Sequence, residues 1–248
     1  MKKIFLTLVA LFSLSIPLAA EKSIDFFADE VPRYEGFALG ASFINQWALG
    51  EYSDYASCNF GGEVDAESVE DMSEMFTGTA IAELDLSNFK TSALKNMKNM
   101  FADCPDLFSV NFGADFDTSH VTDMSGLFQN VWYITELDLS KFDTSSVTSM
   151  ASMFEGMESL ELLDLSSFKT SSVTNMASMF NSCLKLTKIY VGQGWKTSAV
   201  TDSGADMFRS CDRLTGGSGT VYTNTHTDVT YAVIDTPETP GYLTKLGE

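Results

Sequence analysis

The fold class is decided by one stretch of the sequence, LELLDLSSFKTSSVTNMASMF at residues 160–180. Its second half, TSSVTNMASMF, occurs almost unchanged as TSSVTSMASMF at residues 144–154. More diverged copies of this half, which we call the Met element, begin at Ser68, Thr91, Thr118 and Thr197. The Phe that closes each copy recurs every 25 to 28 residues, at Phe76, Phe101, Phe128, Phe154, Phe180 and Phe208. Such a fixed period indicates a stack of structural repeats.

The first half of the stretch, LELLDLSSF, recurs between the Met elements, and we call it the strand element. Its other copies are IAELDLSNF from Ile81, LFSVNFGADF from Leu107, ITELDLSKF from Ile134 and LTKIYVGQGW from Leu186. The second and fifth copies carry one extra residue. Apolar side chains alternate with polar ones, as at Leu163 and Leu165, which is the period of a strand with one buried face. We therefore expect five short strands.

The Met element has a different spacing. Its apolar residues lie three, three and one positions apart, at Val173, Met176, Met179 and Phe180. This spacing predicts one face of a short helix. The hydroxyl residues before it, Thr170, Ser171 and Ser172, are expected to cap the first turn. Ten of the 12 Met residues lie in Met elements, so we expect the excess of Met to form core.

Neither element can bury its apolar side alone, whereas stacked copies bury a continuous core. The predicted fold is an α/β solenoid: a leucine-rich-repeat-like right-handed coil of short parallel strands and short helices, with a cap at each end. We divide the chain into a signal peptide at 1–20, an irregular N-terminal cap at 21–62, five to six repeats at 63–214 and a C-terminal cap at 215–248.

The signal peptide is predicted from three features of the first twenty residues. Lys2 and Lys3 precede an apolar run from Ile4 to Ile16, and Ala19 and Ala20 supply a small-residue cleavage site. The run is shorter than the roughly 20 residues needed to span a bilayer, and no later apolar stretch is long enough. We expect a secreted or cell-surface protein without a membrane span.

The strand elements, read as L-x-x-L-x-L, resemble leucine-rich repeats. The full pattern, in which LDLSSF and TSSVTNMASMF are followed by Cys183, resembles the BspA-type family of bacterial leucine-rich-repeat surface proteins over residues 63–248. The resemblance implies adhesion to host matrix or to other cells. The position that usually holds Asn departs from the pattern, and we expect aromatic packing there in place of an Asn ladder, at Phe89, Phe116, Phe142, Phe168 and Trp195.

Charge and motifs narrow the class of function. The 34 acidic and 15 basic residues give a net charge of −19, which disfavours nucleic acid as a partner because phosphate binding needs clustered Lys and Arg. There are two His residues, and no nucleophile elbow, metalloprotease helix, P-loop or dinucleotide fingerprint. We expect a non-catalytic protein with no cofactor and no metal site.

Three of the four cysteines, Cys104, Cys183 and Cys211, each follow a closing Phe by three residues. The other copies fill this position with packing residues, at Thr79, Val131 and Met157. That pattern favours buried free thiols. The alternative is a disulfide between Cys183 and Cys211, which lie in neighbouring copies and would meet oxidising conditions after export.

The outward residues of the strand elements form the candidate protein-binding face, because solenoids bind partners on such extended surfaces. Asp85, Asp138 and Asp164 share one outward position. They indicate either an acidic row for a cation or basic ligand, or local capping of the following turn, which fits better because no spacing matches a calcium loop. The whole face comprises Glu83, Asp85, Ser87, Ser109, Asn111, Glu136, Asp138, Ser140, Leu162, Asp164, Ser166, Lys188 and Tyr190.

The predicted function is that of an exported bacterial interaction protein, secreted or held at the cell surface. We expect it to bind a protein or host-matrix ligand through the strand face. Adhesion itself is an implication of the BspA resemblance and not of the residues. The alternative is a structural component of the cell envelope that self-associates.

Overall fold

The computed structural model of the chain describes residues 23–27, 57–61, 64–201 and 204–246. The predicted signal peptide and most of the predicted N-terminal cap lie outside the described residues.

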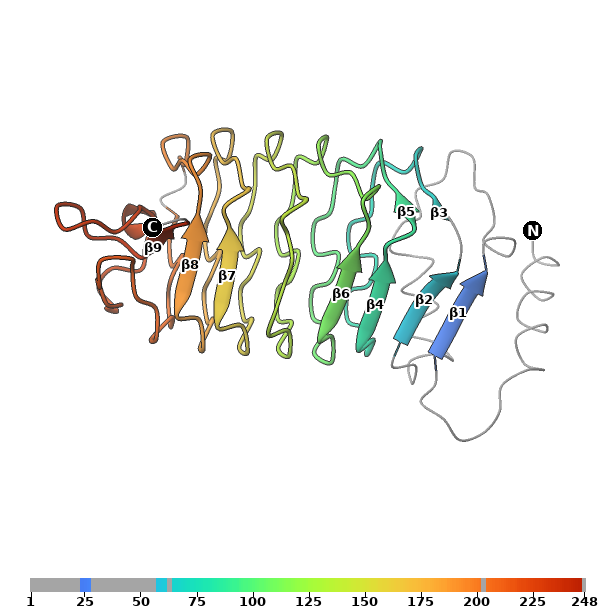
Figure 1. The fold of residues 1–248 in the computed structure, drawn as a ribbon, viewed down its shortest axis with the longest axis horizontal. Coiled ribbons are helices and arrows are strands. Elements are labelled where there is room, and N and C mark those ends of the chain that lie inside the picture. The colour runs from blue at the N-terminus through green and yellow to red at the C-terminus, as the bar shows by residue number, and fades with distance from the viewer. Residues whose placement is uncertain (1–22, 28–56, 62–63, 202–203, 247–248) are drawn as a thin grey trace.

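Short parallel strands in small sheets make up the described fold, and Figure 1 shows them side by side along an elongated body. One sheet has the order β1-β2-β4-β6, formed by Ser23–Phe27, Ser57–Gly61, Glu83–Leu86 and Ser109–Phe112. A second has the order β7-β8-β9, formed by Leu162–Leu165, Lys188–Val191 and Leu243–Lys245. Two short strands pair separately, β3 at Val64–Asp65 and β5 at Phe89–Lys90.

Strand elements of successive copies lie next to one another in register. β4 pairs with β6 so that Glu83 lies opposite Ser109, and β7 pairs with β8 so that Leu162 lies opposite Lys188. All of these pairs are parallel, and each partner is one repeat further along the chain. β4 and β7 bury alternate residues. The predicted short parallel strands are confirmed at four of the five strand elements.

The third strand element, residues 134–142, is not a strand. Its backbone–backbone hydrogen bonding within the described structure is limited to the Phe142 amide and the Leu139 carbonyl, at 3.0 Å. The second copy carries Phe112 where the other four strand elements have Leu or Val. The rings of Phe112 and Phe142 lie 4.9 Å apart between their centroids. The bulkier Phe112 side chain therefore packs between the second and third copies at the interruption.

The Met elements are not helices, and this part of the predicted fold is wrong. They form consecutive tight turns, and the helix found in the described residues is a short 3-10 helix, η1, at Val229–Tyr231 in the C-terminal cap. In the copy at 144–154, alternate amides donate to carbonyls one repeat further on, from Met150 to Asn175, Ser152 to Ala177 and Phe154 to Met179, each at 2.9 Å. An α-helix would direct these amides four residues back within the same copy.

Left-handed backbone conformations explain why the turns do not continue into a helix. Each copy has two such residues four positions apart, one inside the Met element and one just after its closing Phe, as at Ser152 (φ 55°) and Gly156 (φ 73°). The equivalent positions hold Gly, Asn, Asp or Ser in every copy except at Glu74. A positive φ breaks a right-handed helix. The three-and-four spacing of the apolar residues therefore reflects successive turns.

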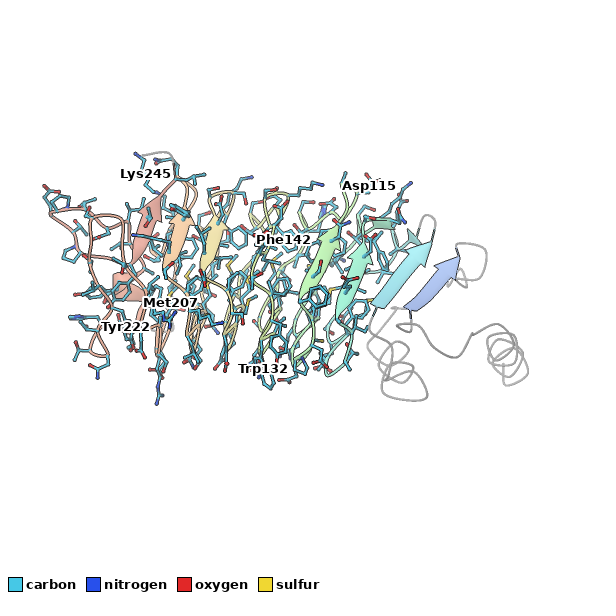
Figure 2. The ribbon with its side chains drawn as sticks, turned by 60° about the horizontal axis from the view of Figure 1, so that its bottom comes forward. Asp115, Trp132, Phe142, Met207, Tyr222 and Lys245 are labelled. Carbon is cyan, nitrogen blue, oxygen red and sulfur yellow. The ribbon has the colours of Figure 1, made fainter. Side chains whose placement is uncertain are left out.

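The core is a column of aromatic rings flanked by Met side chains. The closing Phe rings stack in sequence from Phe76 to Phe208, with neighbouring centroids between 5.2 and 6.2 Å apart. Tyr242 ends the column with its ring edge-on to Phe208 at 5.2 Å. All ten Met residues of the Met elements are buried, including Met207, which Figure 2 labels. The Met excess is core, as predicted.

A ladder of buried Thr hydroxyls links the copies after the first four strand elements. Thr170 Oγ1 donates to the Lys196 carbonyl at 2.7 Å and accepts from the Lys196 amide at 2.6 Å. Thr91, Thr118 and Thr144 donate to carbonyls one repeat further on in the same way. The expectation that Thr170 caps a helix is therefore wrong, because its hydroxyl is used between copies.

The aromatic residues at the position that usually holds Asn are buried beside this ladder, as predicted, at Phe89, Phe116, Phe142, Phe168 and Trp195. Trp195 also uses its polar atom, because Nε1 donates to the Ala232 carbonyl at 3.0 Å. Buried Trp N–H groups usually require such a partner. Aromatic packing and the Thr hydroxyls together hold the turn.

Both ends of the row are extended by further strands. The segment predicted as an irregular N-terminal cap supplies β1 and β2, and β2 pairs with β4. At the other end β9 pairs with β8. The buried Asp235 carboxylate organises this C-terminal cap by accepting the Ser218 amide at 2.7 Å and the Thr220 hydroxyl at 2.6 Å.

Candidate functional site

The thirteen residues of the predicted strand face all lie at the surface, either exposed or half-buried. The strand register places Asp85 opposite Asn111 and Asp164 opposite Tyr190. Five of the thirteen lie on or just after β4 and β6, and five on or just after β7 and β8. The remaining three, Glu136, Asp138 and Ser140, are exposed on the interrupted third element. The face is thus two sheet patches with an irregular copy between them.

The aspartates of this face are used locally. Each carboxylate accepts the amide of the residue two positions on, from Ser87 to Asp85 at 2.9 Å, Ser140 to Asp138 at 2.9 Å and Ser166 to Asp164 at 2.8 Å. The hydrogen bonds from Ser140 lower the pKa of Asp138. Of the two interpretations of this row, local capping of the turn is the arrangement observed.

Other residues of the face differ in how freely they can meet a partner. Lys188 Nζ donates to the Gly216 carbonyl at 2.7 Å, which anchors its ammonium group to the C-terminal cap. Leu162 is an apolar side chain with 49% of its surface exposed among polar neighbours. Glu83 and Glu136 are exposed carboxylates. The residues best placed for binding are therefore Glu83, Glu136 and Leu162.

Cys183 and Cys211 are free thiols, as is Cys104. Each donates to the carbonyl of the closing Phe one copy earlier, from Cys183 to Phe154 and from Cys211 to Phe180, both at 3.0 Å. Burial raises the pKa of Cys211 to about 12, so its thiol stays protonated. The structure thus has both cysteines as free thiols that donate hydrogen bonds in the core, and the bridge between Cys183 and Cys211 stays an alternative for thiol labelling to test.

Away from the strand face, the described residues form two open, shallow grooves. One open groove, with a volume of ≈ 490 Å³, lies after the first strand elements. Its lining includes Lys90, Lys141 and Asp115, and Figure 2 labels Asp115. Across the described residues, no group of three or more His, Cys, Asp or Glu side chains could hold a metal ion. The same residues include no helix with the length and apolar character needed to cross a membrane.

Comparison with known families identifies the repeats. The family model described as "Mycoplasma protein of unknown function, DUF285" matches residues 55–111 and 107–222. The chain belongs to the DUF285 family. The DUF285 match covers all five strand elements and the Met elements, so the repeats carry it. Searches of curated proteins and of solved structures found no match.

Sequence reasoning missed one surface feature of this DUF285 chain. Phe108, Trp132 and Tyr133 are exposed to 49%, 43% and 57%. In the fourth copy the positions of Trp132 and Tyr133 hold Glu158 and Ser159. Aligning the copies residue by residue would have found the feature, because aromatic residues occur there where the repeat accepts polar ones.

Proposed function

We propose that this DUF285 protein is an exported, non-catalytic interaction protein that binds a protein or host-matrix ligand through its strand face. The observation that supports this most directly is the separation of roles along each strand. One side of the strand supplies core residues such as Leu163 and Leu165, and the other side supplies surface residues in adjacent copies. Repeat proteins bind partners on extended surfaces of this kind.

The finer fold that we propose is a leucine-rich-repeat-like right-handed solenoid of the BspA type, in which turns replace the helices. Two ladders support it. The strands pair in parallel one repeat apart, and isolated parallel bridges run through the Met elements from Asp71 by way of Asn96, Asp123 and Ser149 to Asn175. A backbone paired on two sides of each copy makes a rigid platform.

The size of the face sets the strength of binding that we expect. Five strand elements spaced by about 4.8 Å span roughly 19 Å. A stable protein–protein interface buries about 800 Å² on each partner. A face of this size can supply such an area only if the partner also contacts neighbouring surfaces, so we expect moderate affinity from the strand face alone.

The test is capture of ligands by the full chain from host-matrix and bacterial-surface extracts. The face variant should combine Glu83→Ala, Glu136→Ala and Leu162→Ser, because these side chains are exposed and the aspartates are needed for the turns. The matched control combines Asp212→Ala and Glu238→Ala, which remove two exposed carboxylates elsewhere. Loss of capture by the face variant alone supports the proposal. Absence of saturable binding by the wild type refutes it.

The alternative is a self-associating envelope component, and one form of it, end-to-end association, needs an open end on the row of copies. The described C-terminal end is covered, because Ile234 bridges to Leu243 of β9 and Tyr242 closes the aromatic column. This cover favours the interaction protein over end-to-end association. Sedimentation of the pure protein distinguishes the two, since a self-associating component would form larger species as its concentration rises.

A further inference from the structure

Three aromatic side chains protrude where the chain enters the second and third strand elements. We call this surface the aromatic corner, and it consists of Phe108, Trp132 and Tyr133. Trp132 lies at the lower edge of the row in Figure 2. Exposed Trp, Tyr and Phe side chains of this kind are the residue types enriched in protein-binding surfaces.

Backbone contacts bring the two copies together at this corner. The Asp103 amide donates to the Gln129 carbonyl at 2.8 Å, and Asn130 Nδ2 donates to Asp103 Oδ1 at 2.8 Å. Asp103 lies shortly before Phe108, and Asn130 shortly before Trp132. The aromatic side chains of the corner therefore come from adjacent, hydrogen-bonded copies.

The repeat itself does not require these aromatics. In the fourth copy the three equivalent positions are Glu158, Ser159 and Glu161. At the position of Phe108 the backbone bonding does not depend on an aromatic side chain, because the Phe108 amide donates to the Ala82 carbonyl at 2.9 Å and the equivalent Thr187 amide donates to the Glu161 carbonyl at 2.8 Å. Since other copies carry polar residues at these three positions, apolar side chains left exposed here point to a partner.

The charge around the corner indicates the chemistry of that partner. Exposed acidic side chains lie at the equivalent level of the copies on either side of Trp132 and Tyr133. Asp106 is exposed in the second copy, which also carries Phe108. Glu158 and Glu161 are exposed in the fourth copy, which follows the copy of Trp132 and Tyr133. A cation over an aromatic ring is attracted by the electrons of the ring, most strongly for Trp. Nearby carboxylates strengthen that attraction.

We propose that the aromatic corner docks a Lys/Arg-rich segment of a partner protein, whose cationic side chains stack on Trp132, Tyr133 and Phe108. The carboxylates beside the rings supply the complementary charge. This surface is separate from the strand face, so the inference stands whether or not the strand face binds a ligand. A docked segment here would add contact area next to that face.

The experiment is a fluorescence-anisotropy titration of the full chain with a fluorescein-labelled peptide of alternating Arg and Gly, at physiological ionic strength. The test variant F108E/W132E/Y133S copies the residues of the fourth copy, so it keeps the repeat pattern. It also makes the corner more acidic. The control variant S145E/S171E adds the same two negative charges at exposed positions on another side of the row.

We expect saturable binding by the wild type, binding at least about tenfold weaker in the triple variant, and unchanged or slightly tighter binding in the control. Equal or tighter binding by the triple variant would mean that charge attraction alone accounts for the binding, and it would overturn the proposal. If the wild type bound phosphatidylcholine vesicles or dextran and did not bind the peptide, that result would also overturn the proposal.

A second measurement does not depend on the folding of the triple variant. The peptide should protect Trp132 from acrylamide quenching, with the Trp132 contribution defined by the difference between wild type and W132F. Trp195 is buried and provides an internal reference. Quenching of Trp132 that stays unchanged at saturating peptide would also overturn the proposal. The strand-face variant keeps all three aromatic rings of the corner. Because it removes two carboxylates, it should bind this peptide unchanged or slightly more weakly, which separates failure here from failure of the strand-face proposal.

Discussion

The hydroxyl of Thr170 and the backbone of Lys196, one repeat further on, hold each other by two hydrogen bonds. The hydroxyl donates to the carbonyl at 2.7 Å and accepts from the amide at 2.6 Å. Thr144 and Lys169 are joined in the same way, at 3.1 and 2.8 Å. Each copy therefore depends on the next one for the polar groups of its turn.

The Thr170 hydroxyl should contribute measurably to stability. Thr170→Val keeps the shape of the side chain but leaves both Lys196 backbone groups without this partner, so we expect a loss of about 1–3 kcal/mol in the free energy of unfolding. Thr174→Val is the matched control, because Thr174 is exposed and its single bond to the Thr148 carbonyl is 3.2 Å long. Urea unfolding measures both variants. Equal effects would contradict the role of the buried ladder.

The turns of the Met element should respond to substitution in the opposite sense from a helix. Ser178 has a φ of 56°, a conformation in which Gly is tolerated better than Ala. We therefore expect Ser178→Gly to be more stable than Ser178→Ala by about 1 kcal/mol. In a helix, Ala would be the more stable by about 1 kcal/mol. Thermal unfolding of the two variants shows which is the more stable. A more stable Ala variant would contradict the turn and indicate a helix at this position.

The strands and the core were predictable because they follow from alternation and from the repeat period. Leu163 and Leu165 are buried, and the closing Phe residues stack, as a period of about 26 residues requires. The helices were not predictable from spacing alone, since Met176, Met179 and Phe180 show the same offsets on consecutive turns as on a helix. The missed signal was the recurring pair of Gly, Asn, Asp or Ser residues four positions apart.

The C-terminal cap should lose stability in acid through Asp235. Burial raises the pKa of Asp235, but hydrogen bonds from Thr220, Gly241 and Ser218 outweigh it and hold the pKa below its ordinary value of 3.8. A group with a lowered folded pKa stabilises the protein above its unfolded pKa, and this contribution disappears as the pH falls through the folded pKa.

The corresponding variant is Asp235→Asn. Its amide N–H groups would face N–H and O–H donors whose hydrogen bonds the carboxylate now accepts. We expect a loss of about 2 kcal/mol or more at neutral pH, and a difference from wild type that shrinks below pH 3.8. Asp212→Asn, at an exposed position, should have no such effect. Unfolding in guanidinium across the pH range checks this. A difference that persists unchanged in strong acid would contradict the assignment.

The cysteine thiols of the repeats should react only when the protein unfolds. Cys104, Cys183 and Cys211 are buried and protonated, and burial raises the pKa of each. Without reductant, a thiol reagent should label all three in denaturant and label them slowly in buffer. Peptide mass mapping identifies the sites. If Cys183 and Cys211 stay unlabelled in denaturant until reductant is added, the two are bridged.

The binding surfaces were predictable only in part, because composition does not say how a surface residue is used. Asp138 lies on the outward face as expected, yet its carboxylate is committed to the Ser140 amide. Trp132 and Tyr133 escaped notice because aromatic residues are usually assigned to the core. Only comparison with Glu158 and Ser159, at the same positions of another copy, marks them as surplus to the fold.

The most direct test of the account removes one copy. Deleting residues 144–169 joins Asp143 to Thr170, the residue equivalent to Thr144, so every contact type between copies can re-form. If the chain is a row of equivalent stacked copies, the variant should fold cooperatively with lower stability and be shorter by about 4.8 Å in small-angle X-ray scattering. An unfolded or aggregated variant would contradict the stacked-repeat account.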